Sequence, residues 1–302
     1  MPKTVTADMG LNVLLHGDGG QSFFAMPNAK LDNNLIGVTV LAPNAQMKWG
    51  GVGNNRPDAP QHVTLVKDLV TQVLPQMMPG FNPNKVYFTG VSGGSLTLTT
   101  AMIPMFGNMF QSGYLILCGG LASPNGIPAG AIGPNTRIHF QTTTNELASL
   151  QQSIPQSIMA VNQAVATLGL PANQAAKQFT FDGTPTGGHC AFDGQAFTSG
   201  IQAMVNQFGA VMLQSQPATG ITGQVLTPLA QARAFGGAVG AAGKNQAGGT
   251  ATAAGKAKGK KDKKAAAQKQ AKVVKKANTA GKKNANGKKN KKANKVQQKQ
   301  RK

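Results

Sequence analysis

The sequence predicts an α/β fold: a three-layer sandwich with a mostly parallel sheet of about six strands, followed by a disordered basic C-terminal tail. Short apolar runs alternate with longer stretches whose apolar residues recur at helical spacing, which is typical of a parallel sheet covered by helices on both faces. This alternation stops near Gln214. Beyond Lys244 the chain is mostly Lys, Ala, Asn, Gln and Gly and contains no aromatic residue.

Six apolar runs have the length and composition of buried strands. They lie at residues 11–15, 36–41, 85–89, 114–118, 137–142 and 179–181. Helical spacing predicts helices after four of these runs. The predicted helices span residues 58–74, with Asp58 as the cap and Pro60 in the first turn, and residues 95–109, 146–168 and 195–208.

Composition and charge together divide the chain into three parts. Residues 1–212 are predicted to form the folded domain, residues 213–243 a Gly/Ala/Gln-rich linker, and residues 244–302 a Lys-rich disordered tail. Residues 1–243 carry nine Lys and Arg against eight Asp and Glu, whereas the tail carries twenty-one Lys and Arg against Asp262 alone. We expect the tail to bind polyanions such as nucleic acid without sequence specificity.

The sequence does not specify the cellular compartment of the protein. The N-terminus lacks the apolar segment of a signal peptide, and no apolar run approaches the roughly eighteen residues of a membrane span. A basic tail fits the nucleus or cytoplasm, while the weakly charged body fits a secreted protein. Cys118 and Cys190 could form one disulfide, which would indicate an oxidising compartment, or remain two thiols.

The most informative motif is Gly90-Val91-Ser92-Gly93-Gly94, directly after the apolar residues 86–88. A serine with small neighbours behind a strand predicts a sharp strand-to-helix turn that exposes the hydroxyl group. Ser92 is therefore the candidate nucleophile. The backbone N–H of Gly93, at the start of the following helix, is one candidate donor for an oxyanion hole.

A second glycine-rich loop, residues 16–20 (His-Gly-Asp-Gly-Gly), follows the first predicted strand. Gly17 and Asp18 are the candidates for the other oxyanion donor, because backbone that lacks side chains can approach a substrate closely. An ordinary glycine-rich turn is the alternative interpretation. If Asp18 belongs to an oxyanion hole, its carboxylate must point away from the developing negative charge.

Four histidines compete for the role of general base. His16 belongs to the glycine-rich loop and is expected to be structural, His62 begins a helix and is expected at the surface, and His139 lies inside a strand as a core residue. His189 follows two glycines after the last strand, where its ring could reach Ser92. His189 is therefore the predicted base.

The acid that would orient His189 is less clearly specified. Between Ser92 and His189 the carboxylates are Glu146, just after the strand at residues 137–142, and Asp182, at the end of the last strand. The order serine, acid, histidine fits either residue. We favour Glu146 and keep Asp182 as the alternative acid.

Other sites are weakly indicated. Trp49 is the only tryptophan and follows the second strand, where it could line a substrate pocket or simply pack. The histidines are scattered and the carboxylates are few, so the sequence predicts no metal site, and it predicts no cofactor. The oligomeric state is not indicated.

The loop at residues 16–20, the turn at residues 90–94 and the segment Gly187-Gly188-His189 together resemble the α/β-hydrolase superfamily. The absence of a long insertion between the fourth and fifth predicted strands is most similar to feruloyl-esterase and polyhydroxybutyrate-depolymerase-like fungal esterases. This resemblance covers residues 8–212. It implies an eight-stranded sheet, although two opening antiparallel strands have no room before Leu11.

The resemblance implies a serine hydrolase that cleaves small-molecule or polymer-borne carboxylic esters through an acyl-enzyme intermediate. The alternative is a catalytically silent hydrolase-like scaffold that binds polyanions through residues 244–302.

Overall fold

The computed structural model describes residues 4–26, 31–216 and 218. The chain divides into two units at Ala241 and Ala242, and the described residues all belong to the first. The predicted tail at residues 244–302 and most of the predicted linker lie outside the described residues.

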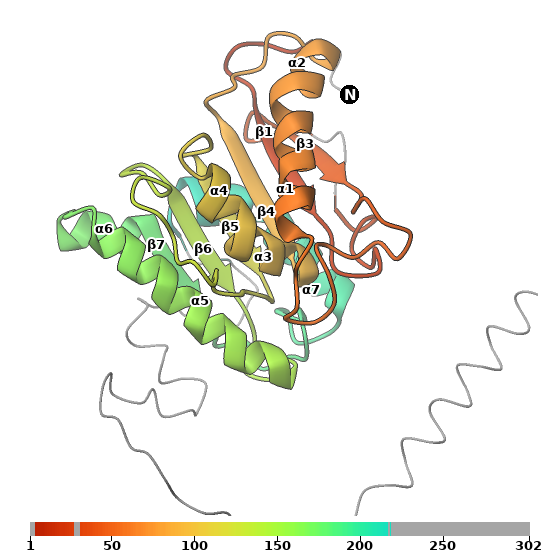
Figure 1. The fold of residues 1–302 in the computed structure, drawn as a ribbon, viewed down its shortest axis with the longest axis vertical. Helices are drawn as coiled ribbons and strands as arrows, with labels where there is room; N and C mark the ends of the chain where they lie inside the picture. The colour runs from red at the N-terminus through yellow and green to blue at the C-terminus, as the bar shows by residue number, and fades with distance from the viewer. Residues whose placement is uncertain (1–3, 27–30, 217, 219–302) are drawn as a thin grey trace, which may run out of the picture. The chain divides into compact units, whose positions relative to one another are not determined.

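A seven-stranded sheet forms the centre of the described part, in the order β2-β3-β1-β4-β5-β6-β7 (Figure 1). All neighbouring strands pair in parallel except β2 and β3, which are antiparallel. The strands are β1 Gly10–Leu15, β2 Leu31–Asp32, β3 Leu35–Val40, β4 Val86–Val91, β5 Gly113–Leu117, β6 Arg137–Gln141 and β7 Phe179–Asp182. The six parallel strands confirm the six predicted from the apolar runs.

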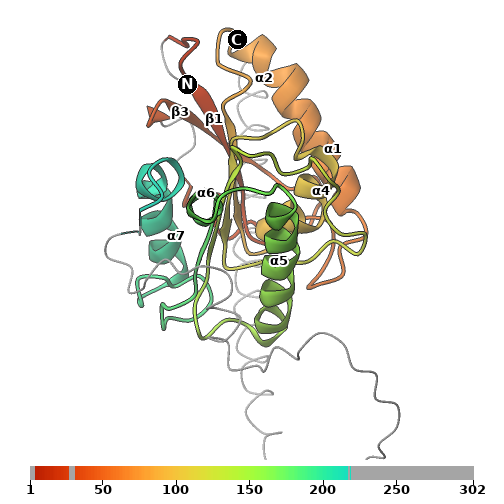
Figure 2. The ribbon, with the colours of Figure 1, turned by 90° about the vertical axis from the view of Figure 1, so that its left-hand side faces the viewer.

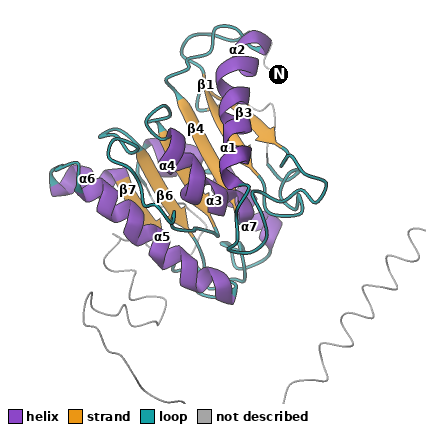
Figure 3. Ribbon diagram, viewed as in Figure 1, coloured by secondary structure: helices purple, strands orange, loops and turns teal. Residues whose placement is uncertain are grey.

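Helices cover both faces of the sheet, as Figures 2 and 3 show. One face carries α1 Ala59–Asp68, η1 Leu69–Val73, α2 Leu74–Met77, α3 Gly93–Thr97, η2 Leu98–Met102, α4 Ile103–Phe106 and α5 Ala148–Ala166. The opposite face carries α7 Phe197–Asn206 and η3 Gly209–Leu213. The predicted α/β sandwich is therefore confirmed.

Three details differ from the sequence prediction. The helix α6, Ala172–Gln178, was not predicted, because its short polar segment has no apolar stripe. The helix expected from residue 146 begins at Ala148, because Leu147 has an extended backbone and leaves Glu146 in the loop before it. The sheet has seven strands instead of the eight that the resemblance implied: among the described residues no strand precedes β1, as the lack of room before Leu11 predicted, and the short antiparallel strand β2, which was not predicted, lies beside β3.

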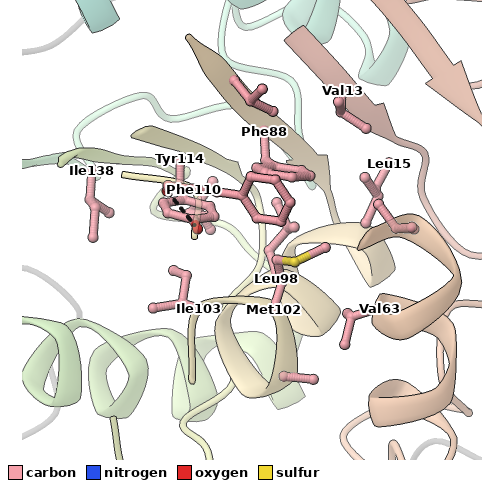
Figure 4. Packing of buried hydrophobic residues seen from close by; sticks show 14 of the residues in the cluster. Val13, Leu15, Val63, Phe88, Leu98, Met102, Ile103, Phe110, Tyr114 and Ile138 are labelled. Atoms are coloured by element: carbon pink, nitrogen blue, oxygen red, sulfur yellow. Dashed lines mark hydrogen bonds between the residues drawn. The ribbon is translucent and has the colours of Figure 1, made fainter. Parts of the chain in front are cut away.

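Two apolar cores hold the layers together. The larger lies between the sheet and the face that carries α1 to α5. At its centre, the ring of Phe88 lies 5.1 Å from that of Phe110 and 5.6 Å from that of Tyr114, and all three are buried (Figure 4). The smaller core packs α7 and η3 against the other face. The sheet is thus buried on both sides, as its nearly continuous apolar strands require.

His139 lies within β6 and is fully buried, as the sequence predicted. Its Nδ1 is 2.8 Å from Oγ1 of Thr180, and its Nε2 is 3.3 Å from Oε1 of Gln141. Burial, together with the nearby charge of Arg137, lowers the pKa of His139 to about 3. The ring is therefore neutral in the folded protein at neutral pH.

Among the described residues, no helix combines the length and the apolar character needed to cross a bilayer.

We expect the free energy of unfolding to fall as the pH drops from about 6.5 to 3. In this window the unfolded chain protonates His139 with an ordinary pKa, whereas the folded chain does not, so protons favour unfolding. Urea unfolding at a series of pH values measures this slope. In a His139→Gln variant the slope should be smaller, and an equal slope would contradict the assignment.

Candidate active site

Ser92 stands at the turn between β4 and α3. Its backbone has φ 49° and ψ −110°, which is a strained conformation for a residue with a side chain. Close main-chain contacts impose this turn. A Cβ on Gly90 would lie 2.7 Å from the backbone nitrogen of Ser95, and a Cβ on Gly94 would collide with the carbonyl oxygen of Leu15. The two glycines therefore let α3 start directly behind β4 and beside β1.

His189 bridges Ser92 and Glu146. Its Nε2 is 3.0 Å from Oγ of Ser92, and its Nδ1 is 2.5 Å from Oε2 of Glu146. The Glu146 side chain is buried, whereas that of His189 is 18% exposed. A substrate could therefore reach the imidazole and the hydroxyl from one side, while the carboxylate is shielded from water.

The loop before α5 and the loop after β7 hold this arrangement together. Oγ1 of Thr142 lies 3.2 Å from the second carboxylate oxygen of Glu146. Further along, the backbone N–H of Thr144 donates to the Pro185 carbonyl oxygen, and the Asn145 side chain donates to that of Thr186. These contacts fix the distance between Glu146 and His189.

Asp182, the alternative acid, faces other partners. Its Oδ1 accepts hydrogen bonds from the backbone N–H and hydroxyl of Thr184, at 2.9 and 2.7 Å, and its Oδ2 accepts one from Nε2 of Gln141. The structure brings Glu146, not Asp182, to His189.

Cys118 and Cys190 form a disulfide beside the site. It joins the end of β5 to the residue after His189. Both half-cystines have positive φ, 44° and 62°. Their sulfur atoms and a ring nitrogen of His189 lie within 4.8 Å of one another, but sulfurs that are bonded together offer no thiolate for a metal. The bond instead ties the histidine loop to the sheet next to Ser92.

The glycine-rich loop after β1 supplies fewer oxyanion donors than predicted. The backbone N–H of Gly17 donates to Oγ of the buried Ser22, at 2.9 Å, so Gly17 is not a free donor and this part of the prediction is wrong. Within the described part of the chain, the N–H groups of Asp18 and Gly93 show no hydrogen-bond acceptor. These two N–H groups are the pair left for an oxyanion.

Arg56 is a residue of the site that sequence reasoning missed. Its guanidinium forms a two-pronged ion pair with the Asp18 carboxylate, with Nη1–Oδ1 at 3.0 Å and Nη2–Oδ2 at 2.7 Å. The same Asp18 oxygen Oδ1 accepts the backbone N–H of Trp49. This carboxylate fills the space that a Cβ on Gly93 would occupy. Asp18 is thus neutralised and anchored next to the candidate oxyanion hole.

Trp49 does not line an open pocket, because its side chain is fully buried. Its ring packs 5.4 Å from the ring of His16 and 6.1 Å from that of His62. His62 was expected at the surface and is instead buried, where its Nδ1 accepts the backbone N–H of Gly50. The loop after β3 folds over the start of α1 and covers both rings.

His16 has a structural role, as predicted. Its Nε2 accepts the backbone N–H of Ala42, so its Nδ1 carries the proton and donates to the Gly17 carbonyl oxygen at 2.6 Å. Burial lowers the pKa of His16, which keeps the ring neutral. The histidine thereby joins the loop after β1 to the loop after β3.

Phe197 is a second neighbour of the site that the sequence did not single out. Its ring centroid lies 5.8 Å from that of His189. Its Cζ would be 3.7 Å from a Cβ placed on Gly17, which itself would lie 3.5 Å from Cβ of Ser92. An aromatic wall therefore stands beside the hydroxyl and the imidazole.

No protein-family model matches this chain, and no curated protein sequence matches it. Solved structures do match. A carboxylesterase from Bacillus cereus is 13% identical, with a TM-score of 0.48, over 68% of this chain and 91% of that one. A protein of unknown function from Agrobacterium tumefaciens is 17% identical, with a TM-score of 0.46, over 70% and 94% of the two chains. SOBER1 from Arabidopsis thaliana is 17% identical, with a TM-score of 0.46, over 66% and 98%.

The strand order and the sharp turn at the end of β4, with helices on both faces, define an α/β-hydrolase-type sandwich. Chemically, the arrangement offers a hydroxyl, a base in contact with it, a buried carboxylate behind the base, and two free backbone donors. These are the parts that acyl transfer through a serine requires.

We expect a Cys118→Ser/Cys190→Ser variant to lose about 2–5 kcal/mol of unfolding free energy. The disulfide closes a loop with a sequence separation of 72 residues, and removing it restores chain entropy to the unfolded state. Urea unfolding of the oxidised parent and the variant measures the loss. Dithiol treatment should destabilise the parent and leave the variant unchanged; a variant as stable as the parent would contradict the expectation.

Proposed function

We propose that the protein is a serine hydrolase that cleaves carboxylic esters through an acyl-enzyme intermediate. The observation that carries this proposal is the position of His189, whose two ring nitrogens contact Ser92 Oγ and Glu146 Oε2 at 3.0 and 2.5 Å. A histidine held in this way can act only with one tautomer, the one that accepts the serine proton at Nε2.

In the first half-reaction, Ser92 Oγ attacks the ester carbonyl carbon while its proton passes to Nε2 of His189. The imidazolium that forms is stabilised by the Glu146 carboxylate at Nδ1. The tetrahedral intermediate then collapses: the bond to the alcohol oxygen breaks, and Nε2 returns the proton to the leaving alcohol. The product on the protein is an ester of Ser92.

In the second half-reaction, water takes the place of the alcohol. His189 removes a proton from the water as its oxygen attacks the acyl carbon, and the same proton is returned to Oγ of Ser92 when the acid leaves. Each half-reaction develops one negative charge on the carbonyl oxygen. We assign its stabilisation to the backbone N–H groups of Asp18 and Gly93.

Arg56 is assigned a positioning role. The Asp18 carboxylate would oppose an oxyanion next to it, and the ion pair with Arg56 cancels this charge. Because Arg56 also donates to the carbonyl oxygens of Trp49 and Gly53, it ties the Asp18 carboxylate, in the loop after β1, to the loop after β3.

The wall formed by Phe197 favours esters with an apolar group over strongly charged ones. Within the α/β-hydrolase type, the resemblance to feruloyl-esterase and polyhydroxybutyrate-depolymerase-like esterases remains part of this proposal. A silent scaffold that binds polyanions through residues 244–302 is the competing proposal. The aligned contacts of His189 favour turnover, because a scaffold needs no hydroxyl–imidazole–carboxylate chain.

A fluorophosphonate probe and a short aryl ester test the proposal. The parent should be labelled at Ser92 and hydrolyse the ester. Ser92→Ala should lose both, with kcat reduced at least about 10⁴-fold, and Glu146→Gln should lower kcat about 10³–10⁴-fold because the imidazolium loses its partner.

Asp182→Asn is the matched control for Glu146→Gln, since it neutralises the other buried carboxylate after Ser92 and should keep kcat within a few-fold. Labelling that persists in Ser92→Ala, or an unlabelled and inactive parent, would end the proposal and leave the scaffold.

Arg56→Gln should lower kcat about ten- to a hundredfold with a smaller change in KM, because an unpaired Asp18 carboxylate then opposes the oxyanion. Adding Asp18→Asn to this variant should restore most of kcat, since the amide carries no charge. Steady-state kinetics with the aryl ester measure both effects. A double variant no faster than Arg56→Gln would show that Arg56 acts only on the stability of the loop.

A further inference from the structure

A pocket lies at the amino ends of the parallel strands, whereas Ser92 lies at their carboxyl ends. It has a volume of about 340 Å³ and is lined by residues at the amino ends of β4 and β6, by α6, and by the segment that ends at Ser215. Arg137 opens β6, while Glu146 follows its carboxyl end. A five-residue strand spans about 16 Å, so a ligand in this pocket would not touch the candidate active site.

Arg137 carries a buried charge in the wall of this pocket. Within the described part of the chain its guanidinium donates only to main-chain oxygens: Nε and Nη2 to Val211, at 3.3 and 2.9 Å, and Nη1 to Ile138 and Gln178, at 3.3 and 3.4 Å. A guanidinium has five N–H groups. One N–H, on Nη2, thus remains without an acceptor among the described residues.

Among the described residues, no acid forms an ion pair with Arg137. None of the eleven residues that line the pocket is Asp or Glu. Burial lowers the pKa of Arg137 to about 10, with no carboxylate that opposes the shift. Carbonyl oxygens carry only partial charge, and buried charges in proteins are normally paired. An anion from solution would complete the site.

The remaining polar groups of the wall suit an oxyanion. Lys177 adds a second positive charge at the rim, and Gln174 adds exposed amide donors. Gln178 is 5% exposed; its Nε2 donates to the Gly133 carbonyl oxygen, and its buried Oε1 has no hydrogen-bond partner among the described residues. Nε and Nη2 of Arg137, the pair of donors that could hold both oxygens of a carboxylate, already donate to the Val211 carbonyl oxygen. The free donors therefore come from separate side chains, which fits a tetrahedral anion better than a planar carboxylate.

We propose that this pocket binds a phosphate group. Arg137 and Lys177 supply the charge, and the free Nη2 proton and the rim amides supply the hydrogen bonds. A bound phosphate would also tie α6 to the segment at residues 209–215.

Isothermal titration of the full-length protein with inorganic phosphate, at constant ionic strength, tests the site. Lys177→Gln removes the rim charge. Gln174→Glu places a carboxylate there, and an acid in the first turn of α6 does not threaten the fold. Each variant should bind phosphate about tenfold more weakly.

The matched controls are Lys67→Gln and Gln152→Glu, which make the same charge changes at solvent-accessible positions outside the pocket. Because every variant keeps the basic residues 244–302, phosphate bound by those lysines affects all of them alike. A parent with no saturable phosphate site, or pocket variants that bind as tightly as the controls, would overturn the proposal.

A second titration with tripolyphosphate distinguishes the source of the phosphate group. Equal variant effects with both probes indicate a single phosphate group, as on a small molecule. Effects with tripolyphosphate alone would overturn the proposal of a site for a single phosphate group. Ser92 lies at the carboxyl ends of the strands and the pocket lies at their amino ends. The result of the titration therefore does not depend on esterase activity.

Discussion

The candidate site depends on one steric constraint, the close approach of α3 to β1 and β4. Gly90 and Gly94 permit this approach because neither has a side chain at the contact. The helix consequently begins one residue after Ser92 and directs its first N–H groups toward the hydroxyl. The loop after β1 then lies within reach of the same point, and His189 arrives from the far end of the sheet through the loop after β7.

The sequence was sufficient for the parts of the fold that depend on local pattern. Apolar runs located the six parallel strands, and small residues around Ser92 located the turn, because both signals lie within a few neighbouring residues. The order of Ser92, Glu146 and His189 along the chain also narrowed the acid to two residues. Choosing between Glu146 and Asp182 required the structure, since both follow strands and their side-chain directions depend on partners in distant loops.

The residues that the sequence analysis missed or misplaced have another property in common. Arg56 lies in a loop without a recognisable pattern, and its partner Asp18 is 38 residues away. His62 and Trp49 were judged by their local positions, but both are buried, with the Trp49 ring packed between His16 and His62. Gly17 was expected to donate to a substrate, and a serine five residues later takes its N–H instead. Long-range or side-chain-specific contacts of this kind leave no periodic signal.

The fit between Gly93 and Asp18 has an evolutionary consequence. The Asp18 carboxylate occupies the volume of a side chain at position 93, and it cannot swing aside because Arg56 and the Trp49 N–H hold it. A lineage that exchanges Gly93 for alanine must therefore first shorten or remove the side chain at position 18. Once that side chain is gone, Arg56 has lost its ion-pair partner and keeps only main-chain acceptors, so its charge is no longer required. The three positions should accordingly change in a fixed order, with Asp18 first.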